Sequence, residues 1–353
     1  MLRVGLIGFG LAGQAFHAPL ITSVDGMELA CVLERRGSSA HEKYPQARIA
    51  RSLDQLLEDQ SIRLCVIATP NLTHFDLAEL CLRAGRDVVV DKPFTVTPLE
   101  ARELIRVADS HKRLLTVFQN RRWDGDFLTV RKLLAAGTLG RVVEYESNYD
   151  RFRPQLKPGA WRESEAPGSG VLYDLGSHLF DQALSLFGTP QGVTGNVLRE
   201  RDGARVDDAF DVRFHYRGLN VTLRATMLAQ ASRPRFRLDG TAGSFVKTSF
   251  DPQEARLRNG EIPADPGWGE DPESDWGTLY LADGEPYKVK TENGDYRQFY
   301  VNVRDAILNG APLAVTARDG WQSIRAIELV RRSSDERRTI SWDDGNSAEP
   351  FDA

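Results

Sequence analysis

The chain has 353 residues, of which 41% are hydrophobic and 27% are charged, an ordinary composition for a globular protein of one or two domains. Its formal net charge of −5 argues against non-specific nucleic-acid binding and gives no membrane-surface signal. No apolar run approaches membrane-spanning length, and a strand begins almost at once without a signal peptide. Three cysteines without C-x-x-C spacing and six histidines without metal-ligand spacing predict a cytoplasmic protein with free thiols and no metal site.

The first predicted elements are a buried strand at residues 3–7, a glycine-rich loop and a helix that reaches about Ile21. A G-x-G-x-x-G run between a strand and a helix is typical of dinucleotide binding. The glycines permit a tight turn, and the helix N-terminus offers free N–H groups to a pyrophosphate. The alternative is a glycine-rich turn without a ligand. The candidate cofactor-binding residues of this run are Gly8, Phe9, Gly10, Leu11, Ala12 and Gly13.

A second predicted strand, residues 28–33, ends at an acid followed by two arginines. Glu34 lies about 20 residues after the glycine loop, the spacing expected of an acid that binds the cofactor ribose. A carboxylate there favours NAD, whereas Arg35 and Arg36 favour NADP because they can pair with a 2′-phosphate. The two signals conflict, so the sequence predicts NAD or NADP without choosing between them.

The strand at residues 64–68 ends in polar residues that we expect on the ligand side, because open α/β sheets bind ligands beyond the carboxyl ends of their strands. Thr73 and Asp76 form a start signal for a helix that reaches residue 84. His74 is either a site residue or a surface residue in the first turn of that helix. The candidate cofactor-binding residues here are Thr69, Pro70, Asn71 and His74.

The next buried strand, residues 88–90, stops at Asp91, Lys92 and Pro93, because proline cannot continue a strand ladder. An ammonium group at this edge is placed to meet a ligand, although an isolated lysine after a strand is more often a surface residue. Thr97 and Glu100 form a capping box for a helix that reaches about His111. A strand at residues 114–118 follows, and Asn120 and Arg121 come directly after it.

Strands and helices alternate up to residue 118, which predicts a doubly wound parallel sheet and an NAD(P)-binding Rossmann domain over residues 1–119. The remainder predicts an α+β domain over residues 120–342 with an open, largely antiparallel sheet, followed by a frayed tail at 343–353. Within it we expect a helix at 127–136, a long strand at 141–153 and successive strands over 206–249. Residues 251–297 read as a loop or irregular hairpins, and residues 316–332 as a final helix. The open sheet predicts a homodimer or a dimer of dimers.

Asp174 and His178 lie four residues apart in a predicted helix that ends near Gly188, so they share a face. A carboxylate beside an imidazole orients the ring and stabilises its cation, as a general base requires. Asp181 and Gln182 extend this polar stripe. The alternative is an N-cap aspartate with a partly buried histidine bonded to it.

Taken together, these motifs resemble the Gfo/Idh/MocA oxidoreductases, and the resemblance covers nearly the whole chain in order. Within that family the chain is most similar to scyllo-inositol dehydrogenase-like members. The family resemblance is carried by residues 8–13, residues 68–74, Asp91-Lys92-Pro93 and Asp174-x-x-x-His178, and the subgroup resemblance by residues 16–21, 120–124 and 150–154.

The resemblance implies roles for individual residues. Lys92 resembles the active-site lysine that bonds the substrate hydroxyl and the cofactor ribose, and His178 resembles the base, with Asp174 as its acidic partner. The bond between Lys92 and Pro93 is often cis in relatives. Trp161 and Arg162 resemble a pair that reaches the cofactor. The usual family motif begins with glutamate, whereas this chain has Asp91, whose role is either to bond the cofactor ribose or to hold Lys92.

We therefore expect a dehydrogenase that reversibly oxidises a secondary hydroxyl of a cyclic polyol or sugar, with NAD or NADP as cofactor. The alternatives are a non-catalytic sensor that binds cofactor and sugar on the same fold, and a dehydrogenase of another substrate such as a dihydrodiol. Candidate substrate-binding residues beside Lys92, Asp174 and His178 are Asn120, Arg121, Tyr149, Arg151, Asp181 and Gln182.

Overall fold

The computed structural model describes residues 1–157, 159 and 163–343, which fold into two compact units. The first unit contains residues 1–128, 251–271 and 292–321, and the second contains the described residues of 129–250, 272–291 and 322–343. The sequence predicts two continuous domains instead, 1–119 and 120–342. The units are discontinuous because two later segments pack with the N-terminal residues. No helix among the described residues is long and apolar enough to cross a membrane.

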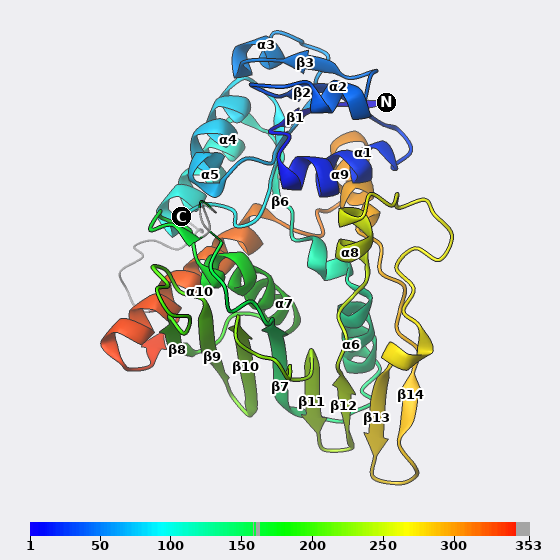
Figure 1. Cartoon of the computed structure of the whole chain (residues 1–353), viewed down its shortest axis with the longest axis vertical. Helices are drawn as coiled ribbons and strands as arrows, with labels where there is room; N and C mark the ends of the chain where they lie inside the picture. The colour runs from blue at the N-terminus through cyan, green and yellow to red at the C-terminus, as the bar shows by residue number, and fades with distance from the viewer. Residues whose placement is uncertain (158, 160–162, 344–353) are drawn as a thin grey trace. The chain divides into compact units, whose positions relative to one another are not determined.

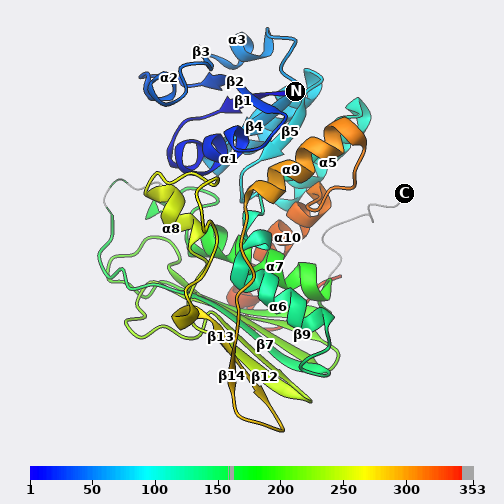
Figure 2. The same cartoon turned by 90° about the vertical axis from the view of Figure 1, so that its right-hand side faces the viewer.

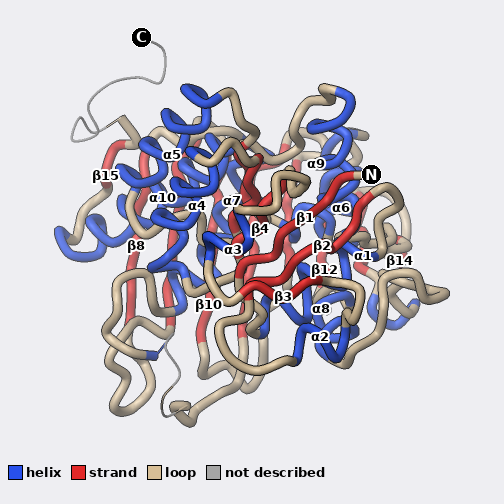
Figure 3. Tube along the Cα trace, turned by 90° about the horizontal axis from the view of Figure 1, so that it is seen from above, coloured by secondary structure: helices blue, strands red, loops and turns tan. Residues whose placement is uncertain are grey.

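The first unit is built on a six-stranded sheet of parallel strands in the order β3-β2-β1-β4-β5-β6. Figure 3 shows β3, β2, β1 and β4 side by side. This order reverses direction after β1, as in the predicted doubly wound fold, so the carboxyl ends of β1, β4 and β5 meet at one edge. The strands are β1 (Leu2–Ile7), β2 (Met27–Leu33), β3 (Arg48–Ala50), β4 (Leu64–Ile67), β5 (Asp87–Val90) and β6 (Leu115–Val117).

Helices cover both faces of this sheet, with α4 and α5 on one side and α1 and α9 on the other (Figure 1). A π-helical turn, η1, runs directly into α1. The helical segments are η1 (Gly13–His17), α1 (Ala18–Thr22), α2 (Ser39–Lys43), α3 (Leu53–Leu57), η2 (Asn71–Thr73), α4 (His74–Arg83), α5 (Pro98–His111), η3 (Asn120–Trp123), α8 (Gln253–Arg258) and α9 (Arg297–Asn309).

Both predicted helix starts are in place, and they differ in how the first turn is capped. The capping box of α5 is confirmed: Thr97 Oγ1 accepts from the Glu100 amide, the Glu100 carboxylate accepts from the Thr97 amide, and Pro98 occupies the first turn. The start of α4 is also where the sequence predicts it, with Thr73 as the N-cap residue and Asp76 in the first turn, but the Thr73 side chain does not cap the helix. Thr73 Oγ1 instead contacts the Pro70 carbonyl oxygen at 2.8 Å and Thr69 Oγ1 at 2.7 Å, which ties the helix start to the end of β4.

Helix α9 is absent from the sequence-based prediction, although its apolar residues are spaced as on one face of a helix. Phe299, Tyr300, Val303 and Ile307 are all buried. Residues 251–297, predicted as a loop or irregular hairpins, contain the hairpin of β13 and β14 and, in addition, the helix α8, which was not predicted. Short elements between polar residues give weak periodicity, and here packing against the rest of the unit defines them.

The second unit is built on a nine-stranded sheet in the order β14-β13-β12-β11-β7-β10-β9-β8-β15. Its pairs are antiparallel except β7 with β10, which are parallel, so the predicted largely antiparallel sheet is confirmed. The strands are β7 (Val142–Asp150), β8 (Gly192–Leu198), β9 (Ala209–Tyr216), β10 (Leu219–Thr226), β11 (Phe236–Gly240), β12 (Gly243–Lys247), β13 (Gly277–Leu281), β14 (Tyr287–Val289) and β15 (Ile340–Ser341).

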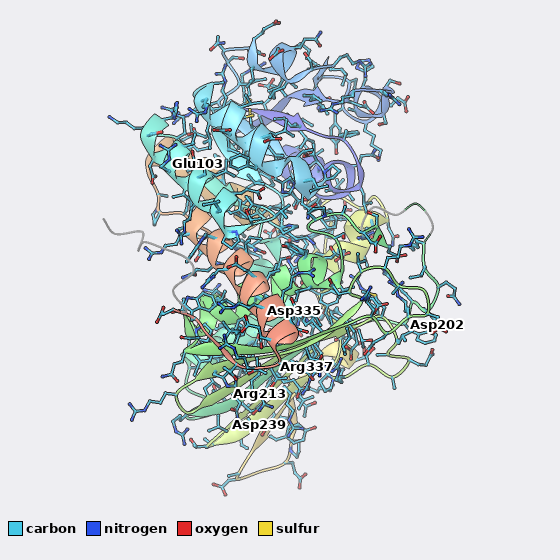
Figure 4. The ribbon with its side chains drawn as sticks, turned by 90° about the vertical axis from the view of Figure 1, so that its left-hand side faces the viewer. Glu103, Asp202, Arg213, Asp239, Asp335 and Arg337 are labelled. Carbon is cyan, nitrogen blue, oxygen red and sulfur yellow. The ribbon has the colours of Figure 1, made fainter. Side chains whose placement is uncertain are left out.

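Helices lie along one face of this sheet, as Figure 2 shows for α7 and α10. The helical segments within the second unit are the π turn η5 (Leu172–Gly176), α7 (Ser177–Phe187) and η6 (Glu273–Asp275). Two further helices, α6 (Gly125–Ala135) and α10 (Ala317–Glu336), begin in residues of the first unit and continue into the second. The strands also carry charges, such as the exposed Arg213 on β9 and the half-buried Asp239 on β11, which are labelled in Figure 4. Arg224 pairs with Glu146 at 2.9 Å and with Asp211 at 2.8 Å, so this surface carries charges of both signs.

Candidate active site

The three glycines of the loop between β1 and η1 have different surroundings. An ideal Cβ on Gly13 would lie 2.4 Å from the Gly8 carbonyl oxygen. A Cβ on Gly8, whose φ is +98°, would lie 2.9 Å from the Ala68 carbonyl oxygen. Packing therefore requires glycine at both positions. A Cβ on Gly10 would meet no heavy atom within 4 Å, so the open side of Gly10 suits the close approach of a pyrophosphate.

The rest of the loop keeps that approach open. Leu11 is 54% exposed, whereas Phe9 is buried and its ring contacts Tyr44 edge-on. A continuous helical segment begins at Leu11 and runs through η1 into α1, so its first amide groups lie directly after Gly10. These features fit a dinucleotide phosphate at the start of the helix.

Glu34, directly after β2, is buried, and its carboxylate accepts hydrogen bonds from the first residues of α2. Ser39 Oγ donates to Oε1 at 2.5 Å, and the Ala40 amide donates to Oε2 at 3.1 Å. Burial opposes ionisation, but these donors, with the Arg51 guanidinium, hold the pKa of the Glu34 carboxyl below its usual value. Arg35 and Arg36 are exposed, so the acid and the two arginines face different surroundings.

His74 is 1% exposed, so the interpretation of it as a surface residue is wrong. Nδ1 lies 2.9 Å from the Pro93 carbonyl oxygen, and Nε2 lies 2.9 Å from the Thr69 carbonyl oxygen. Burial lowers the pKa of His74, and this effect outweighs Asp91 and the two carbonyl groups, which favour the cation. The ring therefore joins the end of β4 to the segment after β5.

The segment after β5 is held at three consecutive residues. The Lys92 amide donates to Asp91 Oδ1 at 2.8 Å, the peptide bond between Lys92 and Pro93 is cis as expected, and the Pro93 carbonyl oxygen contacts His74. Burial opposes ionisation of Asp91, but His17, Lys92 and His74 together hold the pKa of its carboxyl below the usual value.

His17 and Tyr300 are two residues of this site that the sequence analysis did not single out. His17 is fully buried, with Nδ1 2.6 Å from Tyr300 Oη and Nε2 3.7 Å from Asp91 Oδ1. Its position in a run already used for the family resemblance was a usable signal. Tyr300 could not be placed, because it comes from α9, 283 residues further along the chain.

Asn120 and Arg121 in η3 are both 6% exposed. Arg121 Nη1 lies 3.2 Å from Asp124 Oδ2, and Nη2 pairs with Glu254 on α8. Tyr296 Oη also donates to Asp124 at 2.5 Å. Much of the Arg121 guanidinium therefore belongs to a buried ionic cluster that joins three segments of the first unit.

In the second unit, Asp174 lies in the π turn η5 and His178 in the first turn of α7. The interpretation of Asp174 as an N-cap is wrong. Asp207 Oδ2 instead accepts from the Leu172 amide at 2.7 Å, and Arg331 holds Asp207 at 2.8 Å. His178 is 5% exposed, and Asp181 and Gln182 on the same helix are also buried.

Arg235 is a third residue that sequence reasoning missed. Strand alternation places it with the exposed Arg237, yet Arg235 is 1% exposed. Its guanidinium donates to Ser147 Oγ at 2.5 Å and to Gln182 Oε1 at 2.8 Å, which fixes the orientation of the Gln182 amide. Tyr149 packs beside it, with the Arg151 guanidinium 4.9 Å from the Tyr149 ring centroid. The candidate residues Tyr149, Arg151 and Gln182 thus adjoin one cluster.

Comparison with protein families accounts for both halves of the chain. Residues 2–119 match the model described as "Oxidoreductase family, NAD-binding Rossmann fold", and residues 131–342 match "Oxidoreductase family, C-terminal alpha/beta domain". The chain belongs to the Gfo/Idh/MocA oxidoreductase family.

Individual Gfo/Idh/MocA proteins resemble it over nearly their full length. The uncharacterised oxidoreductase YdgJ of Escherichia coli is 44% identical over 342 residues, covering 96% of this chain and 98% of YdgJ. The scyllo-inositol 2-dehydrogenase (NADP(+)) IolW of Bacillus subtilis is 38% identical, covering 96% and 95%. The solved structure of the Bacillus subtilis oxidoreductase YvaA has a TM-score of 0.93 and 38% identity, covering 96% of this chain and 98% of YvaA.

This Gfo/Idh/MocA protein is therefore an NAD(P)-dependent dehydrogenase, and the family predicted from its motifs is confirmed. The glycine loop fits the cofactor, as its geometry indicates. Two of the predicted cofactor residues, Trp161 and Arg162, lie outside the described residues. Among the residues that the structure describes, no group of three or more His, Cys, Asp or Glu could hold a metal ion.

Proposed function

We propose that the chain reversibly oxidises a secondary hydroxyl of a cyclic, inositol-like polyol or sugar to a ketone. The observation that carries the proposal is the fixed Asp91-Lys92-Pro93 segment at the carboxyl end of β5. An ammonium group anchored at this edge suits a substrate oxygen that gains negative charge. The 38% identity with a scyllo-inositol 2-dehydrogenase supports the substrate class.

Each of three side chains has a chemical task in this proposal. His178 accepts the proton of the substrate hydroxyl, and Asp174 stabilises the imidazolium that results. Lys92 stabilises the negative charge on the substrate oxygen. Bound NAD(P) supplies the two-electron acceptor for the hydride of the carbinol carbon.

The remaining predicted residues hold the two ligands. The loop from Gly8 to Gly13 and the positions Thr69, Pro70 and Asn71 hold the cofactor, while His74 acts through the carbonyl groups that it contacts. Trp161 and Arg162 remain cofactor candidates from the sequence. Substrate hydroxyls are read by Asn120, Arg121, Tyr149, Arg151, Asp181 and Gln182. Arg235 supports Gln182 in this role.

NADP is the preferred cofactor in this proposal. The sequence left Glu34 and the two arginines in conflict. Both oxygens of the Glu34 carboxylate accept hydrogen bonds from Ser39 and Ala40, whereas Arg35 and Arg36 are exposed. A 2′-phosphate would therefore meet guanidinium groups rather than an unengaged carboxylate. The relative IolW is a scyllo-inositol 2-dehydrogenase (NADP(+)), which supports this preference.

A cytoplasmic homodimer or dimer of dimers also remains part of the proposal. The three cysteines are buried and free, which suits a reducing compartment. The mixed charges on the sheet strands offer a self-complementary surface to a second copy. Light scattering of the purified protein would give the oligomer mass directly.

The function is tested by steady-state kinetics on a panel of scyllo-inositol, myo-inositol, simple sugars and a dihydrodiol with NADP and NAD. We expect turnover with a cyclic polyol or sugar, and a fall in kcat of about 10²-fold or more in both Lys92→Met and His178→Ala, because a positioned acid–base group contributes roughly 10²–10⁴-fold.

The matched controls are Lys288→Met and His111→Phe, which change exposed or half-buried residues outside the candidate site. Unfolding midpoints with and without NADPH separate lost chemistry from lost folding. A loss of less than about tenfold in both site variants would remove the assignment of Lys92 and His178, as acid–base contributions are larger than that.

A further inference from the structure

Three side chains from distant parts of the first unit line up behind Lys92. We propose that Tyr300, His17 and Asp91 form a relay that holds Lys92 in its reactive position, with His17 as a positioning residue. The proposal rests on the proposed function through one assignment, that of Lys92 to the reaction. It resolves the two roles that the sequence left open for Asp91 in favour of holding the lysine.

The relay begins at the backbone of Lys92. Asp91 Oδ1 accepts the Lys92 amide proton at 2.8 Å, and only 15% of the Asp91 side chain is exposed. A carboxylate with so little access to water needs partners, because burial of an unpaired charge is strongly unfavourable. Movement of Asp91 would therefore move the peptide group from which the Lys92 side chain departs.

His17 is the next member. Its side chain has no exposed surface, and Nε2 lies 3.7 Å from Asp91 Oδ1. That separation is beyond hydrogen-bond length, so the contact is electrostatic. Among the described residues Nε2 has no hydrogen-bond partner. A buried polar nitrogen without a hydrogen bond is unfavourable. The attraction of the Asp91 carboxylate offsets part of this cost.

Tyr300 and Phe118 fix the His17 ring in this orientation. Tyr300 Oη lies 2.6 Å from Nδ1, and the Phe118 ring centroid lies 4.4 Å from that of His17. Burial, with the negative charge of Asp91, raises the pKa of Tyr300 well above its usual value. A carboxylate only accepts, so the tautomer that suits Asp91 carries its proton on Nε2, and in that tautomer Nδ1 accepts from the Tyr300 hydroxyl.

The relay spans separate elements of one unit. His17 ends η1, Asp91 follows β5, and Tyr300 lies on α9, which is beside α1 in Figure 1. The titratable groups that face His17 are Tyr300 and Asp91, and Asp91 is in turn influenced by Lys92 and His74. Loss of His17 leaves Asp91 buried with fewer favourable partners, so the pKa of Asp91 must rise.

The test is the pH dependence of kcat/KM in His17→Phe, which keeps a ring against Phe118 and removes both nitrogens. We expect kcat to fall about tenfold or more, since small misplacements of a reacting group have large effects on rate. We also expect the acidic limb of the profile to move upward and become steeper, because Asp91 then gains a proton at a higher pH and adds to the protonation of His178. Tyr300→Phe should move it less in the same direction, and His17→Gln, which restores a donor near the position of Nε2, should recover part of the loss.

The matched control is His215→Phe on β9, where the ring contacts the Thr194 hydroxyl at 2.7 Å, and it should leave the profile unchanged. Nitrogen-15 spectra of labelled histidine in the protein without cofactor give a second readout. The His17 chemical shifts should be those of an unprotonated Nδ1 and a protonated Nε2. Both should change in Asp91→Asn.

The outcomes separate this inference from the proposed function. An unchanged acidic limb in both His17→Phe and Tyr300→Phe, while Lys92→Met is inactive, overturns the relay and leaves the function in place. An active Lys92→Met overturns the function itself. If His17→Phe does not fold, Tyr300→Phe, His17→Gln and the spectra of the unmodified protein decide the question.

Discussion

Polar residues that follow strands look alike in the sequence, but the structure shows which of them are already hydrogen-bonded within the protein. Glu34, His74 and Arg121 all follow strands at the predicted ligand edge, and each is engaged by the protein itself. Glu34 is held by Ser39 and Ala40, His74 by two carbonyl oxygens, and Arg121 by Asp124 and Glu254. Their roles are therefore to shape the site as much as to contact ligands.

The exposed pair Arg35 and Arg36 leads to a prediction at this scale. Replacement of both by alanine should weaken NADPH binding by about tenfold or more, because hydrogen bonds to charged groups contribute roughly 1.5–3 kcal/mol. NADH binding should change by less than about threefold, since NADH lacks the 2′-phosphate. Fluorescence titration at low salt measures both dissociation constants, because salt screens exposed charges.

The matched control for the arginine pair is Arg213→Ala with Arg217→Ala, which removes two exposed positive charges from the second unit. It should leave both affinities unchanged. Equal weakening of NADH and NADPH in the Arg35 and Arg36 variant would show that the arginines do not read the 2′-phosphate.

At the scale of elements, two π-helical turns precede residues of the site. Within the described residues, η1 ends at His17 and η5 lies directly before the turn that carries His178. A π turn accommodates an extra residue and re-aims the side chains around it, and such turns occur often at functional sites. Both turns here lead into regular helices whose buried faces hold them in place.

The start of η5 depends on Gly170. Its φ is +90°, and an ideal Cβ there would lie 2.5 Å from Asp207 Oδ1. Gly170→Ala should therefore lower stability by about 2 kcal/mol or more, since left-handed strain contributes roughly 1–2 kcal/mol and displacement of a buried carboxylate adds to it. Activity should fall too, because Asp207 holds the start of the segment that carries Asp174 and His178.

Gly310→Ala is the control, because Gly310 also has positive φ, +70°, but no atom within 4 Å of the added Cβ. Urea denaturation of both variants separates backbone strain from the clash. An equal loss of unfolding free energy in the two variants would mean that Asp207 moves aside at no cost in stability.

At the scale of the whole molecule, the cofactor-binding unit is completed by distant segments. The Arg63 guanidinium donates to the Ile307 carbonyl oxygen at 2.9 Å, and Thr116 Oγ1 donates to the Val315 carbonyl oxygen at 2.6 Å. With the contact between His17 and Tyr300, these bonds join α9 and the segment after it to residues 1–128.

A fragment of residues 1–128 should therefore fail to fold cooperatively. It lacks Phe299, Tyr300, Val303 and Ile307, which are 1%, 0%, 0% and 8% exposed in the complete chain. Burial of four such side chains contributes about 6–12 kcal/mol at roughly 1.5–3 kcal/mol each, comparable to the whole stability of a domain, about 5–15 kcal/mol. Circular dichroism melts of the fragment and of the complete chain make the comparison.

The companion protein contains the whole first unit, with residues 1–128, 251–271 and 292–321 joined by two flexible linkers. It should regain a cooperative melt and NADPH binding. A fragment of residues 1–128 that melts at the temperature of the intact chain would show that the later segments are dispensable.

Local chemistry was sufficient for much of the fold and part of the site. Three consecutive valines and the proline after them predict β5 and its end. The pair Thr97 and Glu100 predicts the start of α5, because a capping box involves only neighbouring residues. The glycine loop predicts cofactor binding for the same reason, since its turn and the following helix are adjacent in the chain.

Only the tertiary structure could decide which side chains surround Lys92. Asp91 is its neighbour in sequence. His17 follows β1, which β4 separates from β5 in the sheet, and Tyr300 lies on α9, a helix that was not predicted. The partners of Glu34 and the burial of Arg235 likewise depend on loop and strand packing. The sequence alone thus determined the family, the cofactor loop and the lysine, because these depend on neighbouring residues. Long-range packing decided how the lysine is held.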